Sequence, residues 1–253
     1  MSPGYHVNVN NGAQGGNFVN CDLQNNTFNI HSPGGSLFRE NYQRKSFIGK
    51  GSYGEAWKVQ PKNVFTTSQE FMMVKEISCT EEDFKAGINE IEMLKLCRHE
   101  NIICYIENFY EQSKLLMIME FCDGGNLAKF IEAQTELLNV DFITEWVRQL
   151  TSGVCFIHKK KIIHRDLKPA NIFLTSDKKL RIGDFGIAKM LDKSSGLAST
   201  RAGTLLYMAP EILGGDKYNT MADMWSLGII IFEIITYKRP FQGHNWLPAI
   251  FKE

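Results

Sequence analysis

The hydrophobic pattern of the chain changes character at Asp123-Gly124-Gly125. Before this point, short apolar runs with alternating polar residues predict β-strands. These runs are residues 47–59, 71–77, 102–109 and 115–121. After it, apolar residues recur at helical spacing, and the clearest stripes are Trp146, Leu150, Val154 and Ile157, and then Met224–Ile235. The sequence therefore predicts the α+β class, with a strand-rich front part and a helix-rich back part.

One helix is expected within the strand-rich part. Thr80 is a candidate N-cap, and the acidic run Glu81-Glu82-Asp83 suits the positive end of a helix dipole. The apolar residues that follow form one face of a helix: Phe84, Ile88, Ile91 and Leu94. Residues 1–41 are different, because they are rich in Asn and Gly and show no steady hydrophobic period. We expect this segment to be disordered, since it cannot bury enough surface to offset its chain entropy.

Composition narrows the class of protein. The 253 residues contain 28 Lys and Arg and 28 Asp and Glu, so the chain has no general attraction to nucleic acid or to an anionic membrane. Its 6 Cys form no C-x-x-C pair, which argues against a metal knuckle or disulfide framework and favours a reducing, cytoplasmic location. We expect no secretory signal. The apolar run Leu227–Ile235 contains Glu233 and predicts a buried core helix rather than a membrane span.

Three glycines, Gly49, Gly51 and Gly54, fit the pattern G-x-G-x-x-G. A dinucleotide-binding oxidoreductase would need a helix directly after them, but residues 55–59 alternate like a strand. The chain has no G-x-x-x-x-G-K-[ST] sequence, which excludes a P-loop. Two readings stay open at this point: a β-hairpin whose glycine tip covers nucleotide phosphates, or a plain glycine-rich hairpin.

A dense polar segment lies between two apolar pairs, Ile162-Ile163 and Ile172-Phe173. Its polar residues are His164, Arg165, Asp166, Lys168 and Asn171. A loop fixed at both ends by buried strands can hold such groups in constant geometry, as catalytic loops do. The alternative reading of this segment alone is a polar turn around Pro169.

The order of these motifs along the chain resembles the eukaryotic protein kinase family over residues 42–253. The glycine pattern comes first, followed by Lys75 and Glu90, and then by three motifs. These are His164-Arg165-Asp166 with Asn171, Asp184-Phe185-Gly186, and Ala209-Pro210-Glu211. The resemblance implies a bilobal fold with ATP in the cleft between a small β-rich lobe and a larger helical lobe. It divides the chain into residues 1–41, a first lobe with hinge at 42–122, and a second lobe at 123–253.

The resemblance also assigns catalytic roles. Lys75 would hold the α- and β-phosphates of ATP, and Glu90 would pair with its ammonium, although Glu92 is a rival partner. Asp184 and Asn171 would hold Mg²⁺ through oxygen ligands. Asp166 would accept the proton of the substrate hydroxyl. Lys168 would steady the charge of the γ-phosphoryl group.

Further residues would surround the nucleotide by the same resemblance. The glycine hairpin would contribute Ile48, Gly49, Gly51, Ser52, Tyr53, Gly54 and Ala56. Met119 would be the gatekeeper beside the adenine, and backbone groups of Glu120 and Cys122 would bond to the adenine edge. The chain departs from the family pattern at Ala56, where Val is commoner, and at Met73, where Ala is commoner. In the roof of the expected adenine pocket, side-chain volume is therefore lost at residue 56 and gained at residue 73.

The kind of kinase can also be inferred. Lys168 and Thr204 are similar to the serine/threonine-specific pattern, which implies Ser and Thr acceptors on protein substrates. The stretches GSYGEAWKV, NEIEMLKLCRHENIICY, FCDGGNLAKFI and RIGDFGIAK resemble the NIMA-related kinases. That family implies cell-cycle, centrosomal, ciliary or cytoskeletal roles. Thr200 stands where the family carries an activating phosphosite, and the alternative is an ordinary solvated threonine.

The sequence departs from the family most strongly at its end. The helices that normally follow are missing after Glu253, and with them an Arg that would pair with Glu211. We therefore expect an incomplete second lobe. This feature supports a rival hypothesis of another class, a catalytically weak or inactive kinase-like binding module or scaffold.

Overall fold

The computed structural model describes residues 8–9, 19–20, 29–30, 36–51, 54–62, 71–78, 80–185, 205–216 and 219–241. The chain forms two compact units. The first unit consists of Met1–Ile91 and Cys104–Phe121, and the second of Glu92–Ile103 and Cys122–Glu253. None of the helices within the described residues is long and apolar enough to cross a lipid bilayer.

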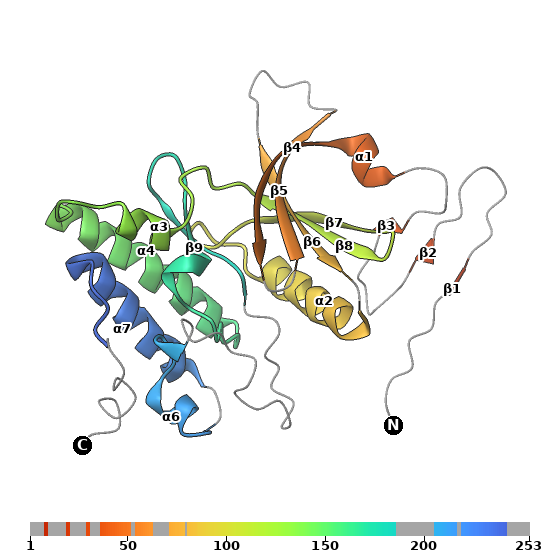
Figure 1. Ribbon diagram of the computed structural model, residues 1–253. Helices are drawn as coiled ribbons and strands as arrows, with labels where there is room; N and C mark the ends of the chain where they lie inside the picture. Colours follow the sequence, from red (N-terminus) through yellow and green to blue (C-terminus); the bar gives the residue numbers. More distant parts are fainter. Residues whose placement is uncertain are drawn as a thin grey trace. The chain divides into compact units, whose positions relative to one another are not determined.

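A six-stranded sheet forms the first unit (Figure 1). Its order is β3-β7-β8-β6-β5-β4, and all neighbours are antiparallel except β3 and β7. The strands are β3 (Asn29–Ile30), β4 (Tyr42–Gly51), β5 (Gly54–Pro61), β6 (Met72–Ser78), β7 (Tyr105–Glu111) and β8 (Lys114–Glu120). Two further strands, β1 (Asn8–Val9) and β2 (Val19–Asn20), pair with each other. The predicted strands are confirmed, with β7 beginning three residues later than the expected Ile102.

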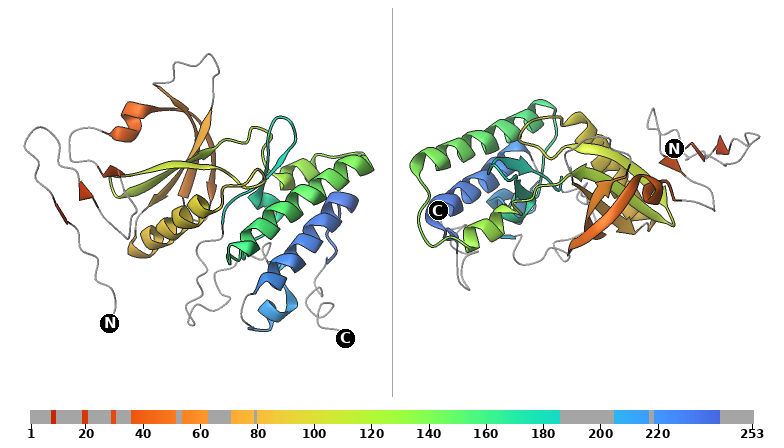
Figure 2. Two further views of the ribbon diagram at one scale, coloured as in Figure 1. Left: turned by 180° about the vertical axis from the view of Figure 1, so that it is seen from behind. Right: turned by 90° about the horizontal axis from the view of Figure 1, so that it is seen from above.

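The two faces of this sheet carry different helices (Figures 1 and 2). On one face, α2 (Glu81–Leu96) packs so closely that a Cβ on Gly87 would lie 2.5 Å from Leu115 Cδ2. This helix was predicted from its cap and its apolar face, and Ile88, Ile91 and Leu94 are buried as expected. The other face carries α1 (Leu37–Asn41). The buried cluster beneath α1 consists of Phe38, Tyr42, Val59, Val74, Phe109, Leu116 and Ile118.

The helix α1 departs from the expectation that residues 1–41 are disordered. Ser36 caps it, because its hydroxyl accepts a hydrogen bond from Arg39 N at 3.1 Å. The ring of Phe38 is only 3 % exposed, and its N–H donates to Glu111 Oε1 at 2.9 Å. Tertiary packing of one aromatic side chain is thus what orders this turn of helix, which is too short to form alone. Most of residues 1–35 lie outside the described residues.

The second unit is mainly helical. Its main helices are α4 (Val140–Lys159) and α7 (Thr220–Thr236), which lie side by side in both views (Figures 1 and 2). Its smaller elements are α3 (Leu127–Glu132), the 3₁₀ turn η1 (Pro169–Asn171), β9 (Ile172–Leu174), β10 (Leu180–Ile182) and α6 (Pro210–Leu213). The predicted stripe of α4 is confirmed, since Trp146, Leu150, Val154 and Ile157 are all buried. The sheet-based first unit and the helical second unit confirm the predicted α+β class.

The second unit includes residues 92–103, which the sequence had placed with the strand-rich part. The reason is a pair of backbone hydrogen bonds to β10. Ile103 N donates to Ile182 O at 2.8 Å, and Ile182 N donates to Asn101 O at 2.8 Å. The ring of His99 also lies 4.9 Å from that of Phe156 on α4. Periodicity within a segment cannot reveal such long-range partners, which is why the sequence pattern grouped residues 92–103 with the strand-rich part.

At Gly54, the last glycine of the pattern, the surrounding backbone leaves no room for a side chain. Its φ is +153°, and a Cβ there would lie 1.7 Å from the carbonyl oxygen of Glu76. We expect Gly54→Ala to lower the free energy of unfolding by about 1–3 kcal/mol, because backbone atoms must move to relieve the overlap. Gly49→Ala is the matched control, since nothing lies within 4 Å of a Cβ at Gly49. Denaturant unfolding of both variants checks this, and equal stabilities would contradict it.

Candidate active site

The first unit presents a buried lysine–glutamate pair. Lys75 Nζ lies 3.1 Å from Glu90 Oε1 and 3.0 Å from Oε2. Lys75 projects from β6 toward α2, which carries Glu90 at the border of its apolar face. The side chain of Glu90 is 1 % exposed and that of Lys75 is 16 % exposed, so the pair is shielded from water. Of the two candidate partners, the structure pairs Lys75 with Glu90.

The glycine pattern lies at one end of the β4–β5 pair, where Gly51 is opposite Gly54. Because β5 follows Gly54 directly, no helix is present to receive a pyrophosphate, and the dinucleotide-oxidoreductase reading is wrong. Ile48 is 43 % exposed on this hairpin. Ser52 and Tyr53 lie outside the described residues.

The residues expected near adenine lie on or just after the strands of the first unit. Met119 is buried on β8 and faces Met73 of β6 in the strand register. Ala56 of β5 is opposite Lys75. Glu120 N donates to Cys104 O at 2.8 Å, so this donor is engaged within the protein. Cys122, the first residue of the second unit in this region, is also buried.

The second unit holds the polar loop that precedes β9. Asp166 Oδ2 lies 2.7 Å from Lys168 Nζ and accepts a hydrogen bond from Asn171 Nδ2 at 3.0 Å. Asn171 Nδ2 also donates to the backbone oxygen of Asp166 at 2.8 Å. Three residues from the predicted set therefore form one cluster. Asp166 and Lys168 are 23 % and 21 % exposed, so both side chains are partly open to solvent.

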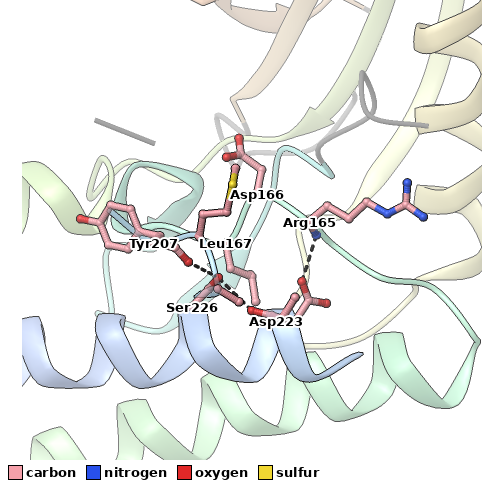
Figure 3. A pocket seen from close by; sticks show the side chains of 9 residues that line it. Arg165, Asp166, Leu167, Tyr207, Asp223 and Ser226 are labelled. Carbon is pink, nitrogen blue, oxygen red and sulfur yellow. Dashed lines mark hydrogen bonds between the residues drawn. The ribbon is translucent and has the colours of Figure 1, made fainter. Parts of the chain in front are cut away.

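The loop is anchored from below by Asp223 of α7 (Figure 3). Its Oδ2 accepts a hydrogen bond from His164 N at 2.9 Å, and its Oδ1 accepts one from Arg165 N at 2.9 Å. His158 Nε2 lies 2.8 Å from the same carboxylate, which is 1 % exposed. Arg165 has a φ of 69°, a left-handed conformation that costs energy in a side-chain-bearing residue. The two hydrogen bonds to Asp223 help to offset that cost.

Sequence reasoning did not assign a role to Asp223. The available signal was a carboxylate at position 223 within a largely apolar helix, in which Glu233 is the other buried carboxylate. The pocket above it is lined by Arg165, Asp166, Leu167, Tyr207, Met208, Ala209, Ala222, Asp223 and Ser226. Figure 3 shows this pocket, in which Ser226 Oγ donates to Tyr207 O at 2.7 Å. The loop and α7 are thus joined by buried polar contacts.

The helix α7 also holds the side chain of Tyr207 through Glu233. The hydroxyl of Tyr207 lies 3.0 Å and 2.9 Å from the two carboxylate oxygens of Glu233. Burial raises the pKa of Glu233, although the Tyr207 hydrogen bond and the charge of Arg239 act in the opposite direction. Thr200 and Thr204, which precede Tyr207, lie outside the described residues.

The loop residues fit a magnesium site. Asn171 Nδ2 donates to the backbone oxygen and to Oδ2 of Asp166, so the nitrogen of the amide, and not the oxygen that a metal would need, is engaged with Asp166. Asp184 follows β10 with a φ of 51°. No group of three or more His, Cys, Asp or Glu side chains in the described ranges is arranged to hold a metal alone. Mg²⁺ suits such a partial site, because it commonly binds one or two carboxylates together with phosphates and water.

Comparison with known proteins shows the family to which the chain is similar. Residues 42–251 match the family described as protein kinase domain. The chain is 38% identical over 214 residues to the serine/threonine-protein kinase Nek3 of Mus musculus, covering 84% of this chain and 41% of that protein. It is 36% identical over 218 residues to Nek5 of Homo sapiens, covering 84% and 30%. It is 38% identical over 218 residues to a putative serine/threonine-protein kinase A of Trypanosoma brucei brucei, covering 83% and 50%.

These relatives confirm the predicted resemblance to NIMA-related serine/threonine kinases. The chain spans at most half the length of the three relatives.

Proposed function

The chain belongs to the protein kinase family, and on that premise we propose that it transfers the γ-phosphoryl group of ATP to Ser and Thr hydroxyls of proteins. The observation that carries this proposal is the cluster in which Lys168 and Asn171 fix the carboxylate of Asp166. Both contacts engage Oδ2, so we assign Oδ1 as the atom that accepts the proton of the substrate hydroxyl. General-base help of this kind contributes about 10²–10⁴ in rate.

Charge neutralisation would come from the lysines. Lys75, oriented by Glu90, would bind the α- and β-phosphates, and Lys168 would approach the γ-phosphoryl group. Bound Mg²⁺ would supply further neutralisation of phosphate charge, and Asn171 Oδ1 and Asp184 are the residues that would hold it. Positioning and electrostatics therefore account for most of the proposed acceleration.

The nucleotide would lie against the first unit's hairpin and the end of β8. Ile48, Gly49, Gly51, Ser52, Tyr53, Gly54 and Ala56 remain our proposed hairpin contacts, with Met119 and Cys122 at the adenine. At Glu120 the adenine contact would use the backbone carbonyl, because its N–H donates to Cys104 O.

Mg-ATP binding and phosphoryl transfer must be tested separately, because the rival binding-module hypothesis predicts the first without the second. We expect Mg-ATP to raise the thermal midpoint of the purified chain and to label a generic basic protein on Ser and Thr. Lys75→Met protein is the control for a contaminating kinase. A shift of the thermal midpoint without phosphoryl transfer would support the binding-module hypothesis. If neither a shift nor transfer is observed, both the kinase and the binding-module hypotheses are rejected.

We also propose that phosphorylation of Thr200 activates the chain. A phosphate there would add acceptor oxygens that an arginine can bind, and Arg165 beside Asp166 is the candidate. We expect Thr200→Ala to lower kcat about 10-fold after preincubation with ATP, while Ser199→Ala changes it little. Initial rates together with phosphosite mapping check this. Full turnover by the Thr200→Ala protein would show that Thr200 is an ordinary loop residue.

The cellular setting is proposed from the NIMA-related resemblance alone. We propose a cytoplasmic protein with a cell-cycle, centrosomal, ciliary or cytoskeletal role. Localisation of a fluorescent fusion relative to centrosome and cilium markers tests this.

A further inference from the structure

The strand that carries Lys75 has a second buried charge on its opposite face. Side chains alternate along a strand, so Glu76 points away from the α2 face and toward the face that bears α1. Glu76 is 4 % exposed. Its Oε1 accepts a short hydrogen bond from Arg44 Nη2, and its Oε2 accepts one from Lys114 Nζ at 3.2 Å. Burying a carboxylate without partners is costly, so these two contacts stabilise Glu76 in its buried position.

The two cations reach Glu76 from opposite sides of β6. Arg44 lies on β4, so its bond to Glu76 spans the intervening strand β5. Lys114 lies on β8, the neighbour of β6 on the other side. The Arg44 guanidinium is further held over the rings of Phe38 of α1, at 5.5 Å, and Trp57 of β5, at 5.4 Å. It is therefore fixed by packing as well as by charge.

The Arg44–Glu76 bond joins the glycine hairpin to the lysine strand. Arg44 is near the start of β4, the strand that runs into Gly49 and Gly51. The backbone oxygen of Glu76 is the atom that Gly54 approaches so closely that a Cβ would overlap it. Residue 76 thus contacts the hairpin through its side chain and its backbone, one residue from Lys75.

From these contacts we infer that Arg44 and Glu76 form a positioning brace for ATP. The brace fixes the glycine hairpin relative to Lys75, so that both meet the phosphates of one nucleotide without rearrangement. Arg44 and Glu76 act through the hairpin and Lys75 rather than by touching substrate. This inference rests on the proposed kinase function and adds two residues on which ATP affinity depends.

A matched pair of variants separates positioning from simple charge balance. Arg44→Met and Lys114→Met each remove one cation from the same carboxylate, but only Arg44 belongs to a strand of the glycine hairpin. If Glu76 needed only charge compensation, the two variants would behave alike. The brace predicts that Arg44→Met raises KM for Mg-ATP about 5- to 10-fold, while Lys114→Met stays within about 2-fold of the unaltered protein.

Steady-state kinetics of the full chain test this, with KM for ATP and KM for the protein substrate measured independently. We expect only KM for ATP to rise in Arg44→Met, and Arg44→Lys to restore part of the loss. Glu76→Gln keeps the side-chain volume and should change KM for ATP in the same direction, so it replaces Arg44→Met if that variant does not fold. Lys45→Ala, an exposed neighbour on β4, should leave both constants unchanged.

The outcomes are distinguishable. Equal changes in Arg44→Met and Lys114→Met, no change in either, or equal rises in both KM values would overturn the brace while leaving the kinase function intact. Failure of the unaltered chain to bind or use Mg-ATP would reject the proposed function, and the brace with it.

Discussion

Replacing Lys75 by Met is expected to lower kcat/KM for phosphoryl transfer about 10³-fold. The substitution removes the cation that we assign to the α- and β-phosphates, and losing one preorganised charge contact commonly costs about 10²–10³ in rate. It also removes from Glu90, which is 1 % exposed, an ammonium 3.0 Å away. Removing one partner of a buried ion pair destabilises a protein by about 3–5 kcal/mol. Activity and stability must therefore be measured together.

Lys75→Arg separates these two effects. It keeps a positive charge beside Glu90, so we expect most of the stability to remain, but a planar guanidinium does not reproduce the phosphate contact of an ammonium. Transfer rates and thermal midpoints of both variants provide the measurement. If Lys75→Met protein retains more than about a tenth of the activity, Lys75 does not have the assigned role.

Replacing Asp223 by Ala is expected to cause a large loss of stability. The carboxylate is 1 % exposed and accepts hydrogen bonds from the backbone of His164 and Arg165. Each buried donor left without an acceptor costs about 1–3 kcal/mol, so two donors approach the whole stability margin of a domain. Because Asp166 follows Arg165 directly, transfer activity should fall as well.

Asp177→Ala is the matched control for this prediction. Asp177 is an exposed carboxylate paired with Lys179, so its removal should change stability by no more than about 0.5 kcal/mol. Denaturant unfolding gives the free energies, and amide exchange at residues 164 and 165 reports the loop directly. An Asp223→Ala protein within about 1 kcal/mol of the unaltered protein, with equally slow exchange, would show that the anchor is unimportant.

Local sequence patterns predicted most of the secondary structure, because their causes are local. The helix after Thr80 and the stripe of α4 follow from helical spacing, and the β4–β5 hairpin follows from alternation around glycines. The resemblance supplied Lys75 and its two candidate partners, and the helical count favoured Glu90, which lies at the border of the α2 apolar face.

The features that escaped prediction depend on distant residues. Phe38 orders α1 through a hydrogen bond to Glu111 and a cluster of strand residues far along the chain. Asp223 bonds to residues 58 and 59 positions earlier. Residues 92–103 join the second unit through β10, some 80 residues later. A hydrophobic period shows which face of an element is buried, but it does not show which element covers that face.

The most direct test of the role of Asp166 is a single-turnover measurement of γ-phosphoryl transfer from Mg-ATP by the unaltered chain and by Asp166→Asn protein. We expect phosphate on Ser and Thr but not on Tyr, formed about 10²–10⁴ times more slowly by the Asn variant. No transfer by the unaltered chain, or an equal rate in both proteins, would contradict the role assigned to the Asp166 cluster.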